Sequence, residues 1–188
     1  MSDNGPSKGR YFWERFALGD HSGAQLAALR RGLGVEVGMA PEMWTYYTTL
    51  EPDGRITRRL RAEHAALGLF AIHQQSESVL VHRAGIGMGT ALRSLRNSGR
   101  FGDDALDARV ERATRSSDLG EVTYHLRGLV RMFKDLSPPL GLDYTQLMRD
   151  LIDWQDDQGL GRARRRWGLA YAASTPLPST NDSRQEIQ

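Results

Sequence analysis

The chain of 188 residues contains no cysteine and no long apolar run. Without cysteine it can form neither a disulfide framework nor a thiolate metal site. No apolar run approaches the ~18 consecutive residues that a membrane-spanning helix needs, and residues 1–9 lack the apolar core of a signal peptide. The sequence therefore predicts a cytoplasmic protein that does not bind membranes.

Sequence motifs for catalysis are also lacking. The chain has no glycine-rich phosphate loop ending in Lys-Ser or Lys-Thr, no serine-hydrolase elbow, and no two histidines four residues apart. Asp103, Asp104 and Asp107 could hold magnesium, but the N-terminus of a helix explains these carboxylates better. Asp150 and Asp153 share a helix face, where we expect them to neutralise arginines rather than to act as an acid–base pair. We therefore predict no catalytic residues, no metal and no cofactor.

Lysine is scarce, because Lys8 and Lys134 are the only lysines among 25 cationic residues. A genomic composition bias can account for part of the arginine excess, but a guanidinium also binds phosphate through two parallel hydrogen bonds and stacks on bases. The formal net charge is only +2, with +4 in residues 1–100 and −2 in residues 101–188. Overall charge thus does not indicate a nucleic-acid-binding protein, and any such function depends on local surfaces.

The apolar residues follow helical spacing almost throughout the chain. The one β-like fragment, residues 79–81, is too short to form a sheet. The sequence predicts an all-α fold of about eight or nine helices. The expected helices span residues 11–18, 22–33, 41–50, 56–75, 90–96, 103–115 and 118–136, with two more inside 143–172.

Turn-forming residues divide the chain into two expected bundles packed in tandem. Asn97-Ser98-Gly99 is the preferred boundary, which gives an N-terminal helical bundle over 9–98 and a C-terminal helical bundle over 99–172. Both ends are rich in Ser, Pro, Asn and Asp and have few large apolar side chains. Segments 1–8 and 173–188 are therefore predicted to be disordered.

Three of the expected helices carry cations at helical spacing along one side. These are, in chain order, Arg55, Arg58 and Arg61; Arg93, Arg96 and Arg100; and Arg127, Arg131 and Lys134. On the last of these helices Glu121 and Asp135 fall on the far side, so that anions and cations are separated. A single stripe of this kind is typical of a solvated helix face. Together with the arginines of the last helix, these stripes are as compatible with a surface that binds a polyanion as with a solvated one.

The arginines of the last helix are expected to lie on two different faces of that helix. Arg164 falls within the apolar arc, where we expect it to pair with a carboxylate such as Asp153 or Asp156. The arginines expected to point outward and to remain available to a ligand are Arg162, Arg165 and Arg166.

The second half of the chain carries a longer pattern. Its parts are Asp118-Leu119, Leu126-Arg127, Val130-Arg131, Asp143-Tyr144, Leu147, Asp150-Leu151, Asp153-Trp154, Arg164-Arg165-Arg166-Trp167 and Ala170-Tyr171. This pattern resembles the CasB family, the small subunit of the type I-E CRISPR surveillance complex, Cascade. The first half agrees through residues 27–31 and 82–83, so that the resemblance covers roughly residues 10–172.

The resemblance implies a non-catalytic subunit that is present in two copies in the complex, next to the guide-RNA backbone protein and in contact with the large subunit. Such a subunit holds the displaced non-target DNA strand, contacts the guide and target strands, and thereby stabilises the R-loop in antiviral defence. The arginines that we expect to contact nucleic-acid backbone are Arg30, Arg31, Arg58, Arg61, Arg93, Arg96, Arg127, Arg131, Arg162 and Arg165.

Two other classes of function stay open at this point. The main alternative is a helical adaptor whose basic faces dock on acidic surfaces of partner proteins during complex assembly. A DNA-binding regulator of helix-turn-helix type is compatible with the paired helices, although no recognition helix stands out. An enzyme is the least favoured class, because no set of catalytic side chains supports it.

Overall fold

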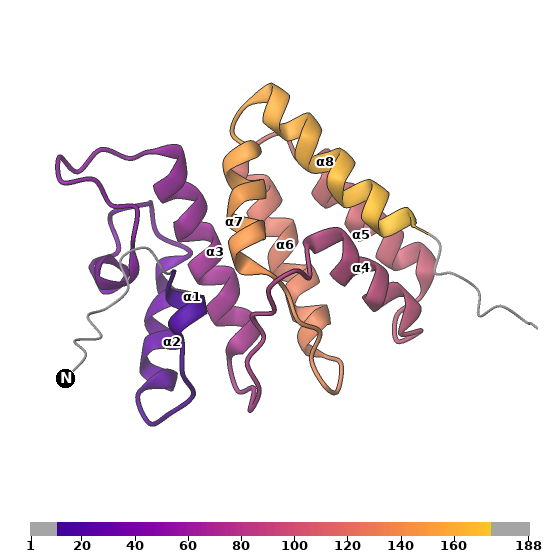
Figure 1. Ribbon diagram of the computed structural model, residues 1–188, viewed down its shortest axis with the longest axis horizontal. Coiled ribbons are helices and arrows are strands. Elements are labelled where there is room, and N and C mark those ends of the chain that lie inside the picture. Colours follow the sequence, from indigo (N-terminus) through magenta and orange to yellow (C-terminus); the bar gives the residue numbers. More distant parts are fainter. Residues whose placement is uncertain (1–10, 174–188) are drawn as a thin grey trace, which may run out of the picture.

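The computed structural model describes residues 11–173, and its regular elements in that range are all helices (Figure 1). They are α1 (Phe12–Arg15), α2 (Ser22–Gly32), the 3-10 helix η1 (Pro41–Tyr46), α3 (Arg58–Gln74), α4 (Met88–Asn97), α5 (Asp103–Arg115), α6 (Leu119–Lys134), α7 (Tyr144–Asp153) and α8 (Asp157–Ala172). The all-α prediction is thus confirmed for these residues. The predicted disorder at 1–8 and 173–188 lies outside the described range, except for Ala173, the C-cap of α8.

Four of the helices begin at a polar side chain that caps the first turn. The side-chain oxygen of Thr57, Asp118, Asp143 or Asp156 accepts the backbone N–H three residues further along. Such a bond satisfies one of the amides that an α-helix leaves without a partner at its N-terminus. The cap at Thr57 places the start of α3 at Arg58, so Ile56 precedes the helix and is exposed rather than part of the predicted apolar stripe.

The helix predicted over residues 41–50 is a shorter 3-10 helix that ends at Tyr46. The cause is a carboxylate on α3. Glu63 is fully buried, and its two oxygens accept the backbone N–H and the hydroxyl groups of Thr48 and Thr49 at 2.6–3.0 Å. These amides are therefore held against α3 and do not continue a helix.

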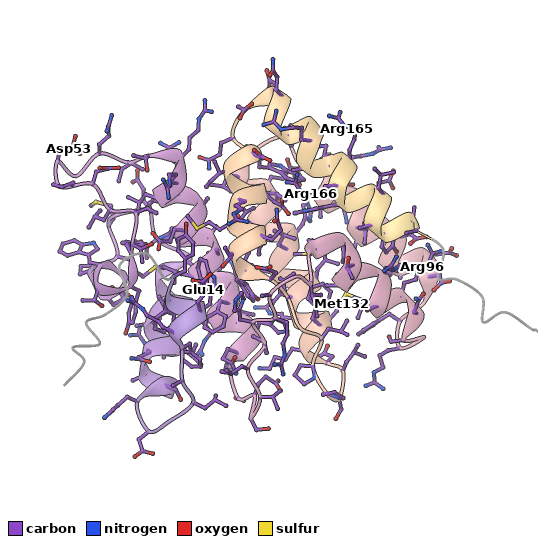
Figure 2. The ribbon with its side chains drawn as sticks, in the orientation of Figure 1. Glu14, Asp53, Arg96, Met132, Arg165 and Arg166 are labelled. Atoms are coloured by element: carbon purple, nitrogen blue, oxygen red, sulfur yellow. The ribbon has the colours of Figure 1, made fainter. Side chains whose placement is uncertain are left out.

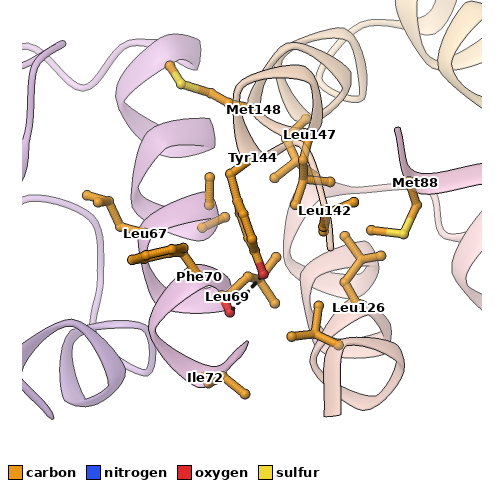
Figure 3. Packing of buried hydrophobic residues seen from close by; sticks show 14 of the residues in the cluster. Leu67, Leu69, Phe70, Ile72, Met88, Leu126, Leu142, Tyr144, Leu147 and Met148 are labelled. Carbon is orange, nitrogen blue, oxygen red and sulfur yellow. Dashed lines mark hydrogen bonds between the residues drawn. The ribbon is translucent and has the colours of Figure 1, made fainter. Parts of the chain in front are cut away.

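Helix α3 lies at the centre of the molecule, because most of its residues from Leu60 to Gln74 are buried. A helix that is buried on nearly all sides must pack against several neighbours, and α3 packs against α2, α6 and α7. Figure 3 shows this packing around Tyr144 of α7. The Tyr144 hydroxyl lies 3.3 Å from the Leu69 carbonyl oxygen and 3.0 Å from Nδ1 of His73, so the buried phenol has partners on α3.

Helix α4 packs chiefly against α8, with further contacts to α5 and α6. The close approach depends on Gly89, because a Cβ atom there would lie 2.4 Å from the backbone oxygen of Trp167. The division of the chain at residues 97–99 stays a prediction. Helices on its two sides nevertheless pack against each other, α4 on α8 and α3 on α6, around one continuous hydrophobic core. Within residues 11–173, no helix is long and apolar enough to span a membrane.

Candidate nucleic-acid interface

A pocket of about 300 Å³ lies where α2, the end of α3 and the second half of α6 meet. The residues that line it are Arg30, Ile72, Gln75, Arg127, Arg131 and Lys134. We call it the basic pocket, because four cations line it and no carboxylate does. Three of the cations follow one another at helical spacing on α6, and the fourth, Arg30, stands in the last turn of α2.

None of these four cations forms an ion pair or a side-chain hydrogen bond with another residue of the described range. Like charges that converge without counterions raise the local positive potential. An anionic ligand relieves that repulsion, and a guanidinium is suited to phosphate because its fork can form two parallel hydrogen bonds. The basic pocket therefore has the chemistry of a phosphate site.

A second and larger concavity, of about 700 Å³, adjoins the basic pocket. It lies between the first turns of α3, which contribute Arg58 and Arg61, and the start of α6 with the two residues before it, which contribute residues 117–120, 123 and 124. We call it the amphipathic groove, because Leu33, Val35, Val37 and Leu119 also line it. Arg127 lines both the groove and the basic pocket, so the two concavities lie next to each other.

The positions of these cations define one seam between α3 and α6. The first turns of both helices border the groove, and later turns of both border the basic pocket, so α3 and α6 run in the same direction. Helix α3 has 17 residues and is therefore about 25 Å long. The basic seam, as we use the term, consists of Arg30, Arg58, Arg61, Arg127, Arg131 and Lys134.

The groove end of the seam also carries carboxylates, and two of them are already bound. Asp118 accepts the N–H of Glu121 at 2.8 Å, which caps α6. Asp156 accepts the N–H of Gly159 at 2.9 Å and lies 3.6 Å from Arg58. Arg58 is therefore partly neutralised, whereas Arg61 has no ion-pair partner among the described residues.

Five of the ten arginines predicted from the sequence thus come together in the seam. They are Arg30, Arg58, Arg61, Arg127 and Arg131. The sequence prediction omitted Lys134, although its spacing of seven residues from Arg127 placed it on the same helix face. Arg31 is exposed on α2 but lines neither concavity.

The two predicted residues on α4 lie elsewhere and contact protein. Arg93 Nη1 lies 3.5 Å from the carbonyl oxygen of Ala173. Arg96 lies 3.2 Å from Asp107 and 3.7 Å from Asp103, and its guanidinium is 5.7 Å from the ring centroid of Tyr171. Burial and the hydrogen bond to Asp107 raise the pKa of Tyr171 to about 12, so its hydroxyl stays protonated. These contacts tie α4 to α5 and α8.

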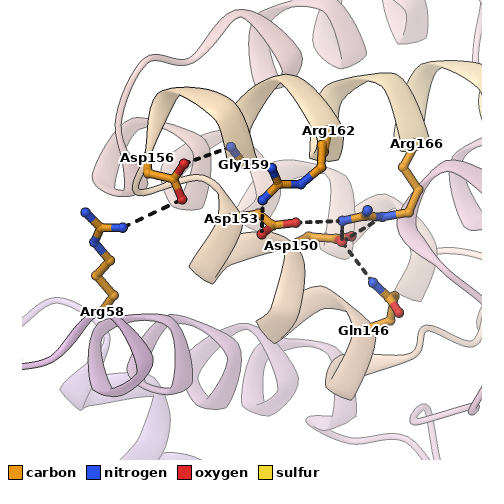
Figure 4. Close-up of polar contacts among 8 residues, drawn as sticks. All are labelled: Arg58, Gln146, Asp150, Asp153, Asp156, Gly159, Arg162 and Arg166. Atoms are coloured by element: carbon orange, nitrogen blue, oxygen red, sulfur yellow. Dashed lines mark hydrogen bonds and ion pairs between the residues drawn. The ribbon is translucent and has the colours of Figure 1, made fainter.

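The arginines of α8 form a C-terminal arginine cluster, Arg162, Arg164, Arg165 and Arg166, and two of them bind carboxylates of α7 (Figure 4). Arg162 lies 3.4 Å from Asp153, and Arg166 contacts both Asp153, at 3.3 Å, and the buried Asp150. The prediction that these aspartates neutralise arginines is confirmed. Desolvation works to lower the pKa of Arg166, but the two carboxylates outweigh it and raise that pKa above its ordinary value.

Arg162 was expected to be available to a ligand, but its contact with Asp153 partly neutralises it. Two further expectations for this cluster are wrong. Arg166 was expected to be available to a ligand, but Asp150 holds it, because α7 packs beside α8. Arg164 was expected to pair with a carboxylate. It instead donates to the carbonyl oxygens of Ser116, at 2.9 Å, and Arg115, at 3.2 Å. Arg165 is exposed on α8, as Figure 2 shows, and forms no polar contact with a described residue.

The described residues contain no group of three or more carboxylate or histidine side chains that could hold a metal ion. Asp103 and Asp104 stand in the first turn of α5, at the helix N-terminus as predicted, although neither side chain caps the helix, and Asp103 and Asp107 face Arg96. Fold and surface together define a small all-helical protein with one basic seam. The family model for CRISPR-associated protein Cse2 matches residues 25–171. The chain therefore belongs to the Cse2 family.

Solved structures of CasB proteins share the fold, and the resemblance seen in the sequence is confirmed. CasB from Thermobifida fusca is 29% identical, with a TM-score of 0.63 over 80% of this chain and 84% of that one. CasB from Thermus thermophilus is 20% identical, with a TM-score of 0.64 over 85% and 92%. A chain described as a CRISPR RNA-guided surveillance complex is 24% identical, with a TM-score of 0.58 over 79% and 81%. Comparison with curated proteins gives no match.

Proposed function

We propose that this chain is a non-catalytic subunit of a CRISPR RNA-guided surveillance complex and that its basic seam binds the phosphate backbone of the displaced non-target DNA strand. The observation that carries the proposal is the basic pocket, in which four cations from two helices meet without a carboxylate in the lining. Membership of the Cse2 family and the similarity to a chain of such a complex support it. The further partners that we propose are the guide and target strands, the guide-RNA backbone protein, the large subunit and a second copy of this chain.

Contacts of this kind suit the task. Opening a DNA duplex against a guide RNA is nearly balanced in free energy, so modest contacts between protein and backbone can determine whether the open state persists. The displaced strand must be held whatever its sequence, and phosphate contacts do not depend on sequence. The seam offers five cations along α3 and α6, each about 25 Å long, and a sixth, Arg30, from α2, and this length spans several phosphates.

Binding of single-stranded DNA over a salt series tests the proposal with the full chain. Each phosphate that a cation neutralises contributes about −0.7 to the slope of log K against log salt for a single strand. With the four cations of the basic pocket engaged, we expect a slope of about −3. Absence of binding at about 50 mM salt, or binding that salt does not weaken, would contradict the proposal.

A separate observation favours docking of partner proteins as a second function. Exposed apolar side chains are concentrated in the connection between α2 and α3, where Val35, Met39, Trp44 and Leu50 are each at least 40% exposed. Exposed apolar side chains that gather on one surface are typical of sites of protein contact, and we infer such a site in this connection. Reconstitution of the complex separates the two functions. A docking variant such as Met39→Ser with Leu50→Ser should impair assembly, whereas seam variants should assemble and fail only when DNA is opened.

A further inference from the structure

Tyr124 is the most exposed aromatic side chain of the described residues. On α6, 70% of its surface is accessible. Its ring has one aromatic neighbour, the edge of His125 at 5.3 Å, and its hydroxyl has no hydrogen-bond partner in the described range. Trp44, the next most exposed, is fixed by a hydrogen bond from Nε1 to the Gly38 carbonyl oxygen at 2.8 Å. The fold therefore makes little use of the Tyr124 ring.

The surroundings of Tyr124 suit a flat ligand that carries a negative charge beside it. The ring lines the amphipathic groove, whose other walls include the apolar side chains of Val35 and Leu119. Arg127 follows three residues later on α6, and residues at this spacing lie side by side on one helix face. Arg61 approaches from α3 across the groove. A nucleotide whose phosphate contacts Arg127 can therefore place its base on Tyr124.

We propose that the amphipathic groove binds an unpaired nucleobase, stacked on Tyr124, of the same strand whose phosphates lie on Arg127 and Arg131. This proposal rests on the proposed function and adds a selectivity that cations cannot provide. Duplex and single-stranded DNA present the same phosphate chemistry, but only an unpaired strand offers a free base face for stacking. The cations thus hold the strand, and Tyr124 makes the surface distinguish an opened strand from a closed duplex.

The test uses the full chain, a single-stranded oligodeoxynucleotide with one 2-aminopurine, and the matching duplex. Stacking on an aromatic side chain strengthens binding by about 5- to 150-fold for each base. We therefore expect Tyr124→Ala to weaken single-strand binding by about tenfold and to abolish the quenching of 2-aminopurine fluorescence, with duplex binding unchanged. Tyr124→Phe keeps the ring and should behave like the wild type. Leu169→Ala removes a similarly exposed apolar side chain from α8, outside the groove, and serves as the matched control.

The variants separate failure of this inference from failure of the proposed function. If Arg127→Ala with Arg131→Ala weakens binding while Tyr124→Ala leaves affinity and quenching intact, the seam binds backbone but the groove holds no base. If Tyr124→Ala spares DNA binding and instead prevents association with the other subunits, the groove is a protein-docking surface. If the wild-type chain binds no single strand at low salt, both proposals are wrong.

Discussion

The basic seam and the C-terminal arginine cluster use the same side chain in different surroundings. In the seam, Arg127 and Arg131 line a pocket that contains no carboxylate. In the cluster, Arg162 and Arg166 contact Asp153 of the neighbouring helix. The difference lies in what the adjacent helix contributes, because α7 supplies aspartates to α8 whereas α2 supplies Arg30 to α6. Arginine spacing on one helix therefore does not show whether the charges are free to bind a ligand.

Between these two regions, the largest loss of stability is expected from a substitution at Asp150. This carboxylate is 1% exposed, and it accepts hydrogen bonds from Trp167 Nε1 at 2.6 Å and from Arg166. Asp150→Ala leaves Trp167 Nε1 without its acceptor and leaves Arg166 with Asp153 alone, so the free energy of unfolding should fall by about 2–4 kcal/mol. Urea denaturation measures this change in the free energy of unfolding. The control is Glu111→Ala, which breaks an exposed pair with Arg115 and should cost less than about 0.5 kcal/mol. Equal losses would mean that the cluster does not hold α7 and α8 together.

The stability of the fold should fall in acid because of His73, a buried residue of α3 that lies near the seam cation Lys134. Burial, with a smaller contribution from the nearby charge of Lys134, lowers the pKa of His73 to about 3. An unfolded histidine titrates near 6.5, so the unfolded chain binds the proton first as pH falls. Stability is therefore complete above about pH 6.5 and is lost progressively toward about pH 3. In His73→Leu this loss should be shallower, though not absent, since the pKa values of His64 and His82 are lowered too.

Thermal unfolding followed by circular dichroism between pH 7 and pH 4 measures the effect. The control is a variant at the exposed His21 of the same chain, which should keep the wild-type slope. Parallel slopes for the wild type and His73→Leu would show that His73 is not buried in its neutral form.

The smallest effect is expected at Arg165, which is exposed on α8 and outside the seam. Because Arg165 contacts no described polar group and lines neither concavity of the seam, Arg165→Ala should change neither stability, beyond about 0.5 kcal/mol, nor single-strand affinity, beyond about twofold. Chemical denaturation and fluorescence anisotropy measure the two quantities. A large loss of affinity would extend the nucleic-acid surface onto α8, as the sequence alone suggested.

Elements with a clear apolar stripe and a capping residue could be predicted from the sequence. The helix expected over 118–136 occupies Leu119–Lys134, with Asp118 as its cap. The segment 41–50 was less predictable, because Glu63, far along the chain, takes the amides that would have continued the helix. Local spacing contains no information about such a distant acceptor.

The residues of the candidate site could likewise be predicted only in part from the sequence. The spacing of Arg127, Arg131 and Lys134 placed these three residues on one face, and that half of the basic pocket follows from the sequence. Nothing local indicates that Arg30 joins them, since its place depends on how α2 packs against α3. For Arg166, the position on the helix predicts that the side chain points outward. It does not predict that Asp150 of α7 lies beside it.

The most direct test of the account compares two double variants in single-stranded DNA binding over the same salt series. Arg127→Ala with Arg131→Ala removes two cations of the basic pocket, and Arg162→Ala with Arg165→Ala removes two of the C-terminal cluster. The seam variant should lose at least tenfold in affinity at low salt, and its slope should become shallower by about 1.4, with unchanged helical circular dichroism. The cluster variant should keep the wild-type slope. An equal loss of slope in both variants, or a loss in the cluster variant alone, would contradict the claim that unpaired seam cations carry the binding.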